Sequence, residues 1–182
     1  AIQALYIPVV NVETLKKSTV PKSESVSIAT NDKPATIAGL ADGNIILKKD
    51  FVFENITQLE NVYLAGGEPM LMKENFEFLT LLKEKNPNCH IRVNTNLSTT
   101  ATGIFELLCT FKNVHWTVSV ESIEEEYNYI RHHGDWNDFV KNLDVINKLD
   151  HKISFNMLHF ILNYKSIHSC VDFLKGKGFH DN

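Results

Sequence analysis

The chain has 182 residues, of which 43% are hydrophobic, and carries a net charge of -4 from 18 basic and 22 acidic side chains. This length suits one substantial hydrophobic core, and we expect a single domain over residues 1–182. The basic residues are scattered along the sequence, so no run of them marks a surface for nucleic acid or anionic lipid. We therefore expect neither nucleic acid nor membrane as a partner.

The three cysteines, Cys89, Cys109 and Cys170, are widely spaced and odd in number. This pattern does not suggest a disulfide framework, and it favours buried thiols in a reducing, cytoplasmic compartment. Residues 2–10 are apolar but too short to span a bilayer, and they lack a basic leader or cleavage site. We interpret them as a buried first strand. Because the sequence stops at Asn182 without a structural terminator, we expect a truncation at the carboxyl terminus.

The remaining elements follow in chain order. Residues 21–43 are rich in Pro, Ser, Thr, Asn, Asp and Gly, which predicts an irregular crossover. Residues 44–53 regain apolar character, as expected for a short strand or helix edge. From Asn61 onward, short apolar runs alternate with segments of helical period, which indicates repeated βα units. Strands are expected at 62–65, 90–94, 114–120 and 153–160, and helices at 74–85, 104–111, 136–146 and 167–174.

These elements place the chain in the α/β class with parallel strands. Counting the first strand and the short segment before residue 53, we expect about five or six parallel strands, fewer than the eight of a closed barrel. The prediction is an open, partial (βα) barrel. In such folds ligands bind at the carboxyl ends of the strands, so polar motifs at those positions are candidate binding residues.

Gly66-Gly67-Glu68-Pro69 occupies such a position, directly after the strand predicted at residues 62–65. Consecutive glycines permit backbone conformations and a close ligand approach that side chains would prevent, and Pro69 restricts the exit toward the next helix. Taken alone, an isolated pair of glycines is better explained as a tight strand-to-helix turn. The motifs that follow it in the sequence favour a ligand site.

This tetrapeptide is followed by Asn94-Thr95-Asn96-Leu97, by Ser119-Val120-Glu121 and by residues 127–142. Their order and spacing resemble radical S-adenosylmethionine (SAM) enzymes, in particular the group with a shortened accessory twitch domain, over roughly two thirds of the chain. The resemblance implies that the turn contacts the amino end of SAM through Gly66, Gly67, Glu68 and Pro69. It also implies that three residues approach the ribose and carboxylate of SAM: Asn96, Ser119 and Glu121.

Glu121 departs from the pattern of the family, and Arg131 is a further candidate for contact with the ligand. Glu121 stands where the family more often has Asp followed by Gly, and the additional methylene displaces the carboxylate relative to a ribose. Arg131 offers a planar donor fork suited to the carboxylate of a ligand, and a salt bridge on the surface or between helices is an equal alternative for it.

Radical SAM enzymes hold a four-iron cluster with three cysteines in a CxxxCxxC loop, and this sequence contains no such loop. Where family members have a stretch like Asn-Val-Cys-Asn-Leu-Lys-Cys-x-x-Cys, residues 11–20 place Glu13, Lys17 and Val20 at the cluster positions. None of these three supplies a thiolate, and Val20 has no ligating atom. The family's 4Fe-4S cluster is therefore not supported by this chain, and we assign no metal ligand and no catalytic residue.

The histidines are better explained without a metal. His132 and His133 are adjacent and have no partner at helical spacing, which favours a polar loop pair. His159 falls within the predicted strand 153–160, where it is either a pocket residue or, as we favour, a hydrogen-bonded core histidine.

Three hypotheses for function follow. The leading one is a radical-SAM-like domain that lacks its cluster and is inactive alone, as a pseudoenzyme, a remnant or an altered fragment. The second is a module that binds SAM or another nucleotide without redox chemistry. The third is a modified or incomplete form of an active radical SAM enzyme. The sequence does not identify a substrate, a peptide partner or another protein partner.

Overall fold

A computed structural model of the chain describes residues 27–30, 33–36, 53, 56–65, 68–98 and 103–180, with the backbone alone for the first two ranges. Four strands form one parallel sheet in the order β3-β4-β5-β6. Their bounds are β3 (Asn61–Leu64), β4 (His90–Thr95), β5 (Val114–Ser119) and β6 (Lys152–Asn156). The helices are η2 (Ile56–Gln58), η3 (Pro69–Leu71), α2 (Lys73–Lys85), α3 (Ile104–Cys109), α4 (Glu124–Ile130), α5 (Trp136–Ile146) and α6 (Ile167–Gly176).

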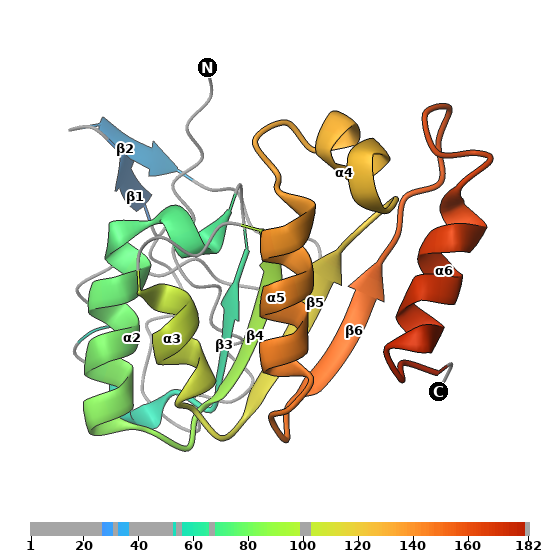
Figure 1. The fold of residues 1–182 in the computed structure, drawn as a ribbon. Coiled ribbons are helices and arrows are strands. Elements are labelled where there is room, and N and C mark those ends of the chain that lie inside the picture. Colours follow the sequence, from blue (N-terminus) through green and yellow to red (C-terminus); the bar gives the residue numbers. More distant parts are fainter. Residues whose placement is uncertain are drawn as a thin grey trace.

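The helices α2, α3 and α5 cover one face of the sheet (Figure 1). Successive parallel strands joined by right-handed crossovers place their connecting helices on the same side, which is the arrangement of a (βα) barrel. The sheet is open, because β3 and β6 do not pair with each other. This confirms the predicted α/β class and the open, parallel arrangement. The strand expected at residues 2–10 lies outside the described residues.

Alternate residues of each strand face the helices. Burial in β5 alternates from Val114 to Ser119, with Val114, Trp116 and Val118 buried. The Trp116 ring packs against Phe105 of α3, with ring centroids 5.8 Å apart, so the buried set is the one that faces the helices. The residues between them lie on the opposite side, which we call the inner face of the sheet.

Helix α2 has the predicted position, but its buried face differs by one aromatic residue. In the sequence Phe76, Leu79 and Leu82 have helical spacing, whereas the structure buries Asn75, Phe78, Leu79 and Leu82. The side chain of Phe76 is 42% exposed. The buried residues are spaced i, i+3, i+4 and i+7, which defines a single stripe on the helix, and Phe76 lies outside it.

The prediction of an irregular crossover at residues 21–43 was wrong in part. Strands β1 (Ser27–Thr30) and β2 (Lys33–Thr36) pair antiparallel, with Thr30 opposite Lys33. A segment rich in turn residues can therefore contain paired strands when these are short, here of four residues each.

The last strand is shorter than predicted, since β6 ends at Asn156 rather than near Phe160. The fully buried Asn163 holds the following segment away from the sheet. Its Nδ2 donates to the carbonyl oxygens of Glu121 and Leu158 at 2.9 and 2.8 Å, and its Oδ1 accepts from the Phe160 backbone at 2.8 Å. His159 consequently lies outside the strand and is exposed, so the prediction of a core histidine was wrong.

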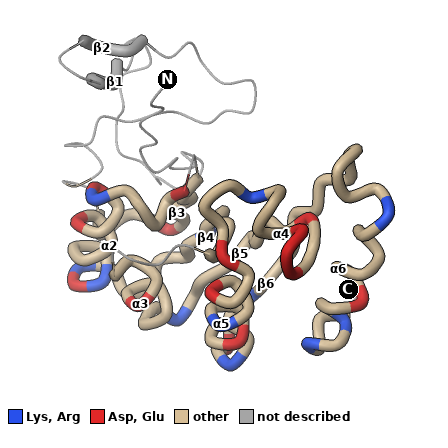
Figure 2. The backbone as a smooth tube through the Cα atoms, turned by 45° about the horizontal axis from the view of Figure 1, so that its top comes forward, with Lys and Arg blue, Asp and Glu red and all other residues tan. Residues whose placement is uncertain are grey.

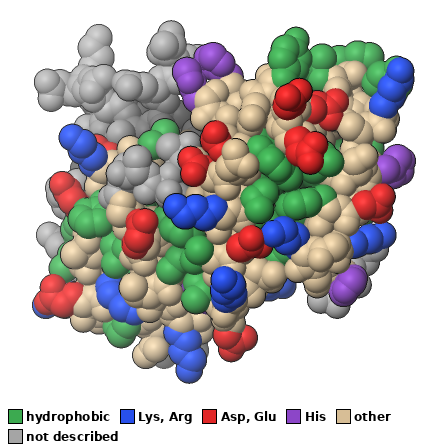
Figure 3. All heavy atoms as spheres, viewed as in Figure 1, with side chains coloured by type: hydrophobic (Ala, Val, Ile, Leu, Met, Phe, Trp, Pro, Cys, Tyr) green, Lys and Arg blue, Asp and Glu red, His purple; other side chains and the backbone are tan. Residues whose placement is uncertain are grey.

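Charged residues of both signs are interspersed over the described part of the molecule (Figure 2). An exception is the first turn of α4, which carries Glu124, Glu125 and Glu126. The side covered by helices also shows both signs between hydrophobic side chains (Figure 3). None of the described helices has the length and apolar character needed to cross a bilayer.

Candidate functional site

The predicted ligand-binding residues gather where the parallel strands end. Glu68 lies beyond the end of β3, Asn96 directly follows β4, and Ser119 is the last residue of β5. Glu121 follows β5 by two residues, and Arg131 caps the carboxyl end of α4. Parallel strands bring their carboxyl ends to the same edge, which explains this convergence. Gly66 and Gly67 lie outside the described residues.

Glu68 links the turn after β3 to the end of β4. Its Oε1 accepts from the Thr95 hydroxyl at 2.8 Å and from the Met70 backbone N–H at 3.3 Å. Its Oε2 accepts from the backbone N–H of Asn96 at 2.8 Å. The side chain therefore caps η3, and it also holds two neighbouring strand ends together. This role of Thr95 was not predicted from the sequence.

Burial raises the pKa of Glu68, and the hydrogen bonds from Asn96, Thr95 and Met70 oppose that rise, as does the positive charge of Arg131. Because the pKa rises overall, the effect of desolvation on it is larger than the combined effect of these hydrogen bonds and of Arg131. A carboxylate oxygen can accept more than one hydrogen bond, so Oε2, with one protein donor, retains acceptor capacity for an ammonium group.

Pro69 is buried at the start of η3, and its carbonyl oxygen accepts from Asn75 Nδ2 of α2 at 2.9 Å. This contact ties the beginning of η3 to the following helix. Pro69 thus has a structural partner, and the structure places its ring in the core beside Met70 rather than at an exposed edge.

Glu121 and Arg131 form a bidentate ion pair. Arg131 Nε donates to Glu121 Oε2 at 2.7 Å, and Nη2 donates to Oε1 at 2.6 Å. The side chain of Glu121 is 13% exposed and that of Arg131 is 20% exposed. The salt bridge that was one alternative for Arg131 is therefore present. Each carboxylate oxygen still has a second lone pair, so the pair can accept hydroxyl donors without breaking.

Asn96 accepts hydrogen bonds through both its side chain and its backbone carbonyl. Its Oδ1 accepts from the Ser98 backbone N–H at 3.0 Å, forming a local turn. Its carbonyl oxygen accepts from the Tyr127 hydroxyl of α4 at 3.2 Å. Tyr127 is fully buried, and burial raises its pKa to about 12, so this hydroxyl is a donor at neutral pH. Helix α4, which the sequence pattern did not predict, thereby connects the end of β4 to Arg131.

Two orphaned polar atoms lie on the inner face below these residues. Asn94 Oδ1 and Thr117 Oγ1 are buried and have no hydrogen-bond partner among the described residues. The two residues are opposite each other across β4 and β5. Buried polar atoms are almost always paired, so an orphaned pair indicates a place for a ligand or ordered water. Neither residue was predicted from the sequence as a binding residue, although strand alternation places Thr117 on the same face as Ser119.

The described residues do not fit a 4Fe-4S cluster. Cys89 precedes β4, Cys109 ends α3 and Cys170 lies in α6. Burial raises the pKa of these thiols to about 12, 11 and 12, respectively, which opposes formation of the thiolates that a cluster needs. No group of three or more His, Cys, Asp or Glu in the described ranges could hold a metal ion. Glu13, Lys17 and Val20 lie outside these ranges.

His132 and His133 lie in the turn between α4 and α5, and both are exposed. Their ring centroids are 3.8 Å apart, so the rings contact each other. This confirms the prediction of a polar loop pair.

Several solved structures have a similar fold. Streptococcus suis SuiB bound to S-adenosylmethionine aligns with a TM-score of 0.53 at 19% identity, over 65% of this chain and 27% of that one. SuiB bound to the precursor peptide SuiA gives 0.56 at 19% identity, over 77% and 33%. Native anSMEcpe with bound AdoMet and Cp18Cys peptide gives 0.54 at 17% identity, over 75% and 42%. The chain thus spans less than half of each of these proteins.

No curated protein sequence matches the chain. The sequence model of the radical SAM superfamily matches residues 49–174, which is more than half of the 182 residues. This match includes all the residues that converge at the carboxyl ends of β3, β4 and β5. The chain therefore belongs to the radical SAM superfamily.

Proposed function

We propose that this chain binds SAM at the carboxyl ends of β3, β4 and β5, and that it does not assemble a 4Fe-4S cluster from its own residues. On this proposal it is a radical SAM domain that is inactive alone. The proposal rests on two observations together. Polar residues converge at the carboxyl ends of β3, β4 and β5, which we call the ligand edge, and the three cysteines lie on different segments, with Cys89 and Cys170 buried and Cys109 partly buried. The twitch-domain group and a cytoplasmic location are parts of the same proposal.

Several contacts support binding of SAM. The amino group of SAM would approach Glu68, whose Oε2 accepts one protein donor and retains a lone pair. The ribose hydroxyls would donate to Glu121, whose position is fixed by Arg131. Ser119 is the last residue of β5, and it offers a hydroxyl that both donates and accepts.

The ion pair between Glu121 and Arg131 supports the assignment of Glu121 as a ribose-binding residue. The two hydrogen bonds from Arg131 hold the Glu121 carboxylate in one orientation before a ligand arrives. A preorganised acceptor loses less conformational entropy on binding than a mobile one. The longer Glu side chain, which weakened the sequence prediction, is therefore compensated by a fixed position.

The neighbours supply the ligand class but not this chain's activity. The names of the SuiB and anSMEcpe structures report bound SAM, and some also report a bound peptide. At 19% identity or less, these similarities carry the fold alone. The choice of SAM for this chain therefore depends on its own residues and on the superfamily to which it belongs.

Isothermal titration calorimetry with SAM and S-adenosylhomocysteine tests the binding half of the proposal. We expect saturable heat with the unmodified protein and an affinity about tenfold lower for Glu121→Gln, which weakens acceptance from the ribose. Glu125→Gln is the matched control, because Glu125 is exposed in the first turn of α4. Absence of heat at millimolar SAM would contradict the proposal.

Anaerobic reconstitution with iron and sulfide tests the other half. We expect no stoichiometric cluster in the ultraviolet-visible spectrum and no SAM cleavage on addition of a reductant. A stoichiometric cluster with SAM cleavage would overturn the proposal in favour of an ordinary radical SAM enzyme.

A further inference from the structure

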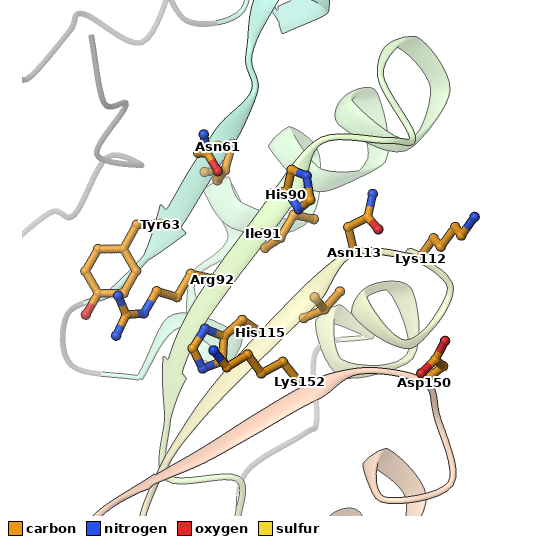
Figure 4. Close-up of a pocket in the computed structure, with 12 residues that line it drawn as sticks. Asn61, Tyr63, His90, Ile91, Arg92, Lys112, Asn113, His115, Asp150 and Lys152 are labelled. Atoms are coloured by element: carbon orange, nitrogen blue, oxygen red, sulfur yellow. The ribbon is translucent and has the colours of Figure 1, made fainter. Parts of the chain in front are cut away.

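A row of side chains crosses the inner face near the beginning of the strands. Tyr63 of β3 pairs with Arg92 of β4, Arg92 pairs with His115 of β5, and His115 pairs with Lys152 of β6. These residues occupy the same level on neighbouring strands, so their side chains project to the same side. We call Arg92, His115 and Lys152 the basic row. Figure 4 shows these three side chains and Tyr63 on one side of the strands.

The basic row lines a cavity of about 720 Å³. This cavity lies over the first half of the strands, since its lining includes His90 and Lys152, the first residues of β4 and β6. It is therefore separate from the ligand edge at the carboxyl ends, where Ser119 and Glu121 lie. The lining of this cavity includes neither of those residues.

Asp150 is the only carboxylate among the described residues that line the cavity with the basic row. Among the described residues, no ion pair joins Arg92 or Lys152 to an acidic side chain. Asp150 lies in the turn before β6 and not on the strands (Figure 4). Arg92 instead lies over the Tyr63 ring, with its Cζ 5.6 Å from the ring centroid. A cavity with this lining has a positive potential.

The pKa of His115 responds to this positive potential. Its Nε2 lies 2.8 Å from the Ser154 hydroxyl, which holds the ring in place and leaves Nδ1 for another partner. Burial lowers the pKa of His115, and the charges of Arg92 and Lys152 lower it further. Protonation of His115 is thus opposed by its neighbours on both strands. An anion between these groups would remove that opposition.

The row has side-chain lengths that suit one shared anion. Its central member is short and its two flanking members are long, and neighbouring strands are only about 4.8 Å apart. The head of Lys152 can therefore reach toward His115. In the structure the head of Arg92 lies over the Tyr63 ring on the β3 side, and sharing an anion with Lys152 requires it to turn toward His115. Arg92 supplies a planar fork for two oxygens, and Lys152 supplies a point charge with three donors. The Tyr63 ring restricts the motion of Arg92.

We propose that the basic row binds the oxyanion group of an acidic ligand, a phosphate or a pair of carboxylates that carries two negative charges. The site is independent of SAM binding, because it uses the opposite end of the sheet. Two or three cations within one cavity match a dianion better than a single carboxylate, since charge-assisted hydrogen bonds are the strongest that side chains make.

Sulfate is the first probe, because it stays a dianion over the range in which histidine titrates. Proton NMR of the imidazole groups follows His115 during sulfate addition, with sodium chloride at equal ionic strength as the blank. We expect saturable shifts of the His115 signals and a higher His115 pKa with sulfate bound. By linkage, sulfate then binds more tightly at about pH 6 than at about pH 8. His90 and Asp150 also line the cavity and can respond to sulfate. The variant His115→Gln identifies the His115 signals and shows which part of the pH dependence comes from the other groups.

Charge-removing variants test the assignment. We expect Arg92→Gln and Lys152→Gln each to weaken sulfate binding about tenfold, as the loss of one charge-assisted hydrogen bond predicts. Lys112→Gln is the matched control, because Lys112 lines the same cavity from the turn before β5 and should change affinity less than about twofold. Calorimetry with SAM distinguishes this test from the test of SAM binding, since Arg92→Gln and Lys152→Gln should leave the affinity for SAM unchanged.

Titrations with methyl phosphate and succinate distinguish the two sources of the anion. Tighter binding of methyl phosphate identifies a phosphate ester, and tighter binding of succinate identifies a dicarboxylate. Either result supports the proposal if Arg92→Gln and Lys152→Gln abolish the difference in affinity between methyl phosphate and succinate. Failure of all three anions to give saturable shifts of His115, or equal losses in the Lys112→Gln control, would overturn it.

Discussion

The guanidinium group of Arg131 holds the carboxylate of Glu121 through two parallel hydrogen bonds of 2.7 and 2.6 Å. The pair joins the segment after β5 to the carboxyl end of α4, where Arg131 is the helix cap. Asn163 also contacts Glu121, because its Nδ2 donates to the Glu121 carbonyl oxygen at 2.9 Å. Three segments of the chain thus meet at one acidic residue.

Replacing Arg131 with Lys should test the geometry of this pair independently of its charge. Lys retains the positive charge but cannot make two parallel hydrogen bonds, so we expect Arg131→Lys to lower the free energy of unfolding by about 1 kcal/mol. We also expect a several-fold loss of SAM affinity. Urea unfolding of Arg131→Lys, Glu121→Gln and the double variant measures the coupling. A coupling energy near zero would contradict the account.

Replacing Glu68 with Ala should destabilise the protein by about 2 kcal/mol, because the Asn96 N–H and the Thr95 hydroxyl each lose an acceptor in a partly buried site. Glu74→Ala is the control, since Glu74 is exposed in the first turn of α2, and it should change stability by less than about 0.5 kcal/mol.

The effect of Glu68→Ala should also depend on pH. Burial raises the pKa of Glu68 in the folded protein, so its carboxyl group stabilises the fold most below its unfolded-state pKa. That contribution is lost as the pH rises through the folded-state pKa. The difference in unfolding free energy between the unmodified protein and Glu68→Ala should therefore narrow from acidic to neutral pH. A difference that widens with pH would show the opposite shift.

His151 should contribute to stability through Trp116. The indole Nε1 donates to His151 Nδ1 at 3.0 Å, and His151 Nε2 lies 2.8 Å from the Phe111 carbonyl oxygen. His151→Ala leaves the indole N–H of a fully buried tryptophan without its acceptor, which should lower stability by about 1–3 kcal/mol. His168→Ala, at an exposed position of α6, should have little effect on the same thermal denaturation curve. Equal losses in both variants would contradict this role.

The thiols should react slowly in the folded protein. Burial raises the pKa of Cys89 and Cys170 to about 12, and raises that of the partly buried Cys109 to about 11 with help from Glu106. Because the thiolate is the reactive form, Ellman's reagent should modify Cys109 first and the other two only on unfolding. Rapid modification of all three at neutral pH would contradict the described burial.

The sequence predicted the regular part of the fold well, because each βα unit after residue 61 has a distinct periodicity. The strand at β5 and the helix at α5 fall almost where the patterns place them. Short elements were less predictable. Helix α4 has seven residues and a single buried side chain, Tyr127, so it presents no repeating stripe. Likewise, the end of β6 is set by Asn163, whose hydrogen bonds lie outside any periodic pattern.

The candidate site was predictable in its location but not in its contacts. The rule that ligands bind at carboxyl strand ends drew attention to the turn that contains Glu68, and the resemblance to radical SAM enzymes added Asn96 and Ser119 as candidates. It could not indicate that Glu68 would accept from Thr95, or that Arg131 would pair with Glu121, because these contacts join residues brought together only by the folded chain. Nor did scattered basic residues reveal the basic row, since Arg92 and Lys152 meet only through strand register.

The most direct test of the central claim is a calorimetric titration of SAM under anaerobic conditions, on protein prepared with and without iron and sulfide. The account predicts saturable binding in both preparations with the same affinity, because Glu68, Ser119 and Glu121 make the site and no cluster contributes. Binding that appears only after treatment with iron and sulfide, or no binding in either preparation, would contradict it.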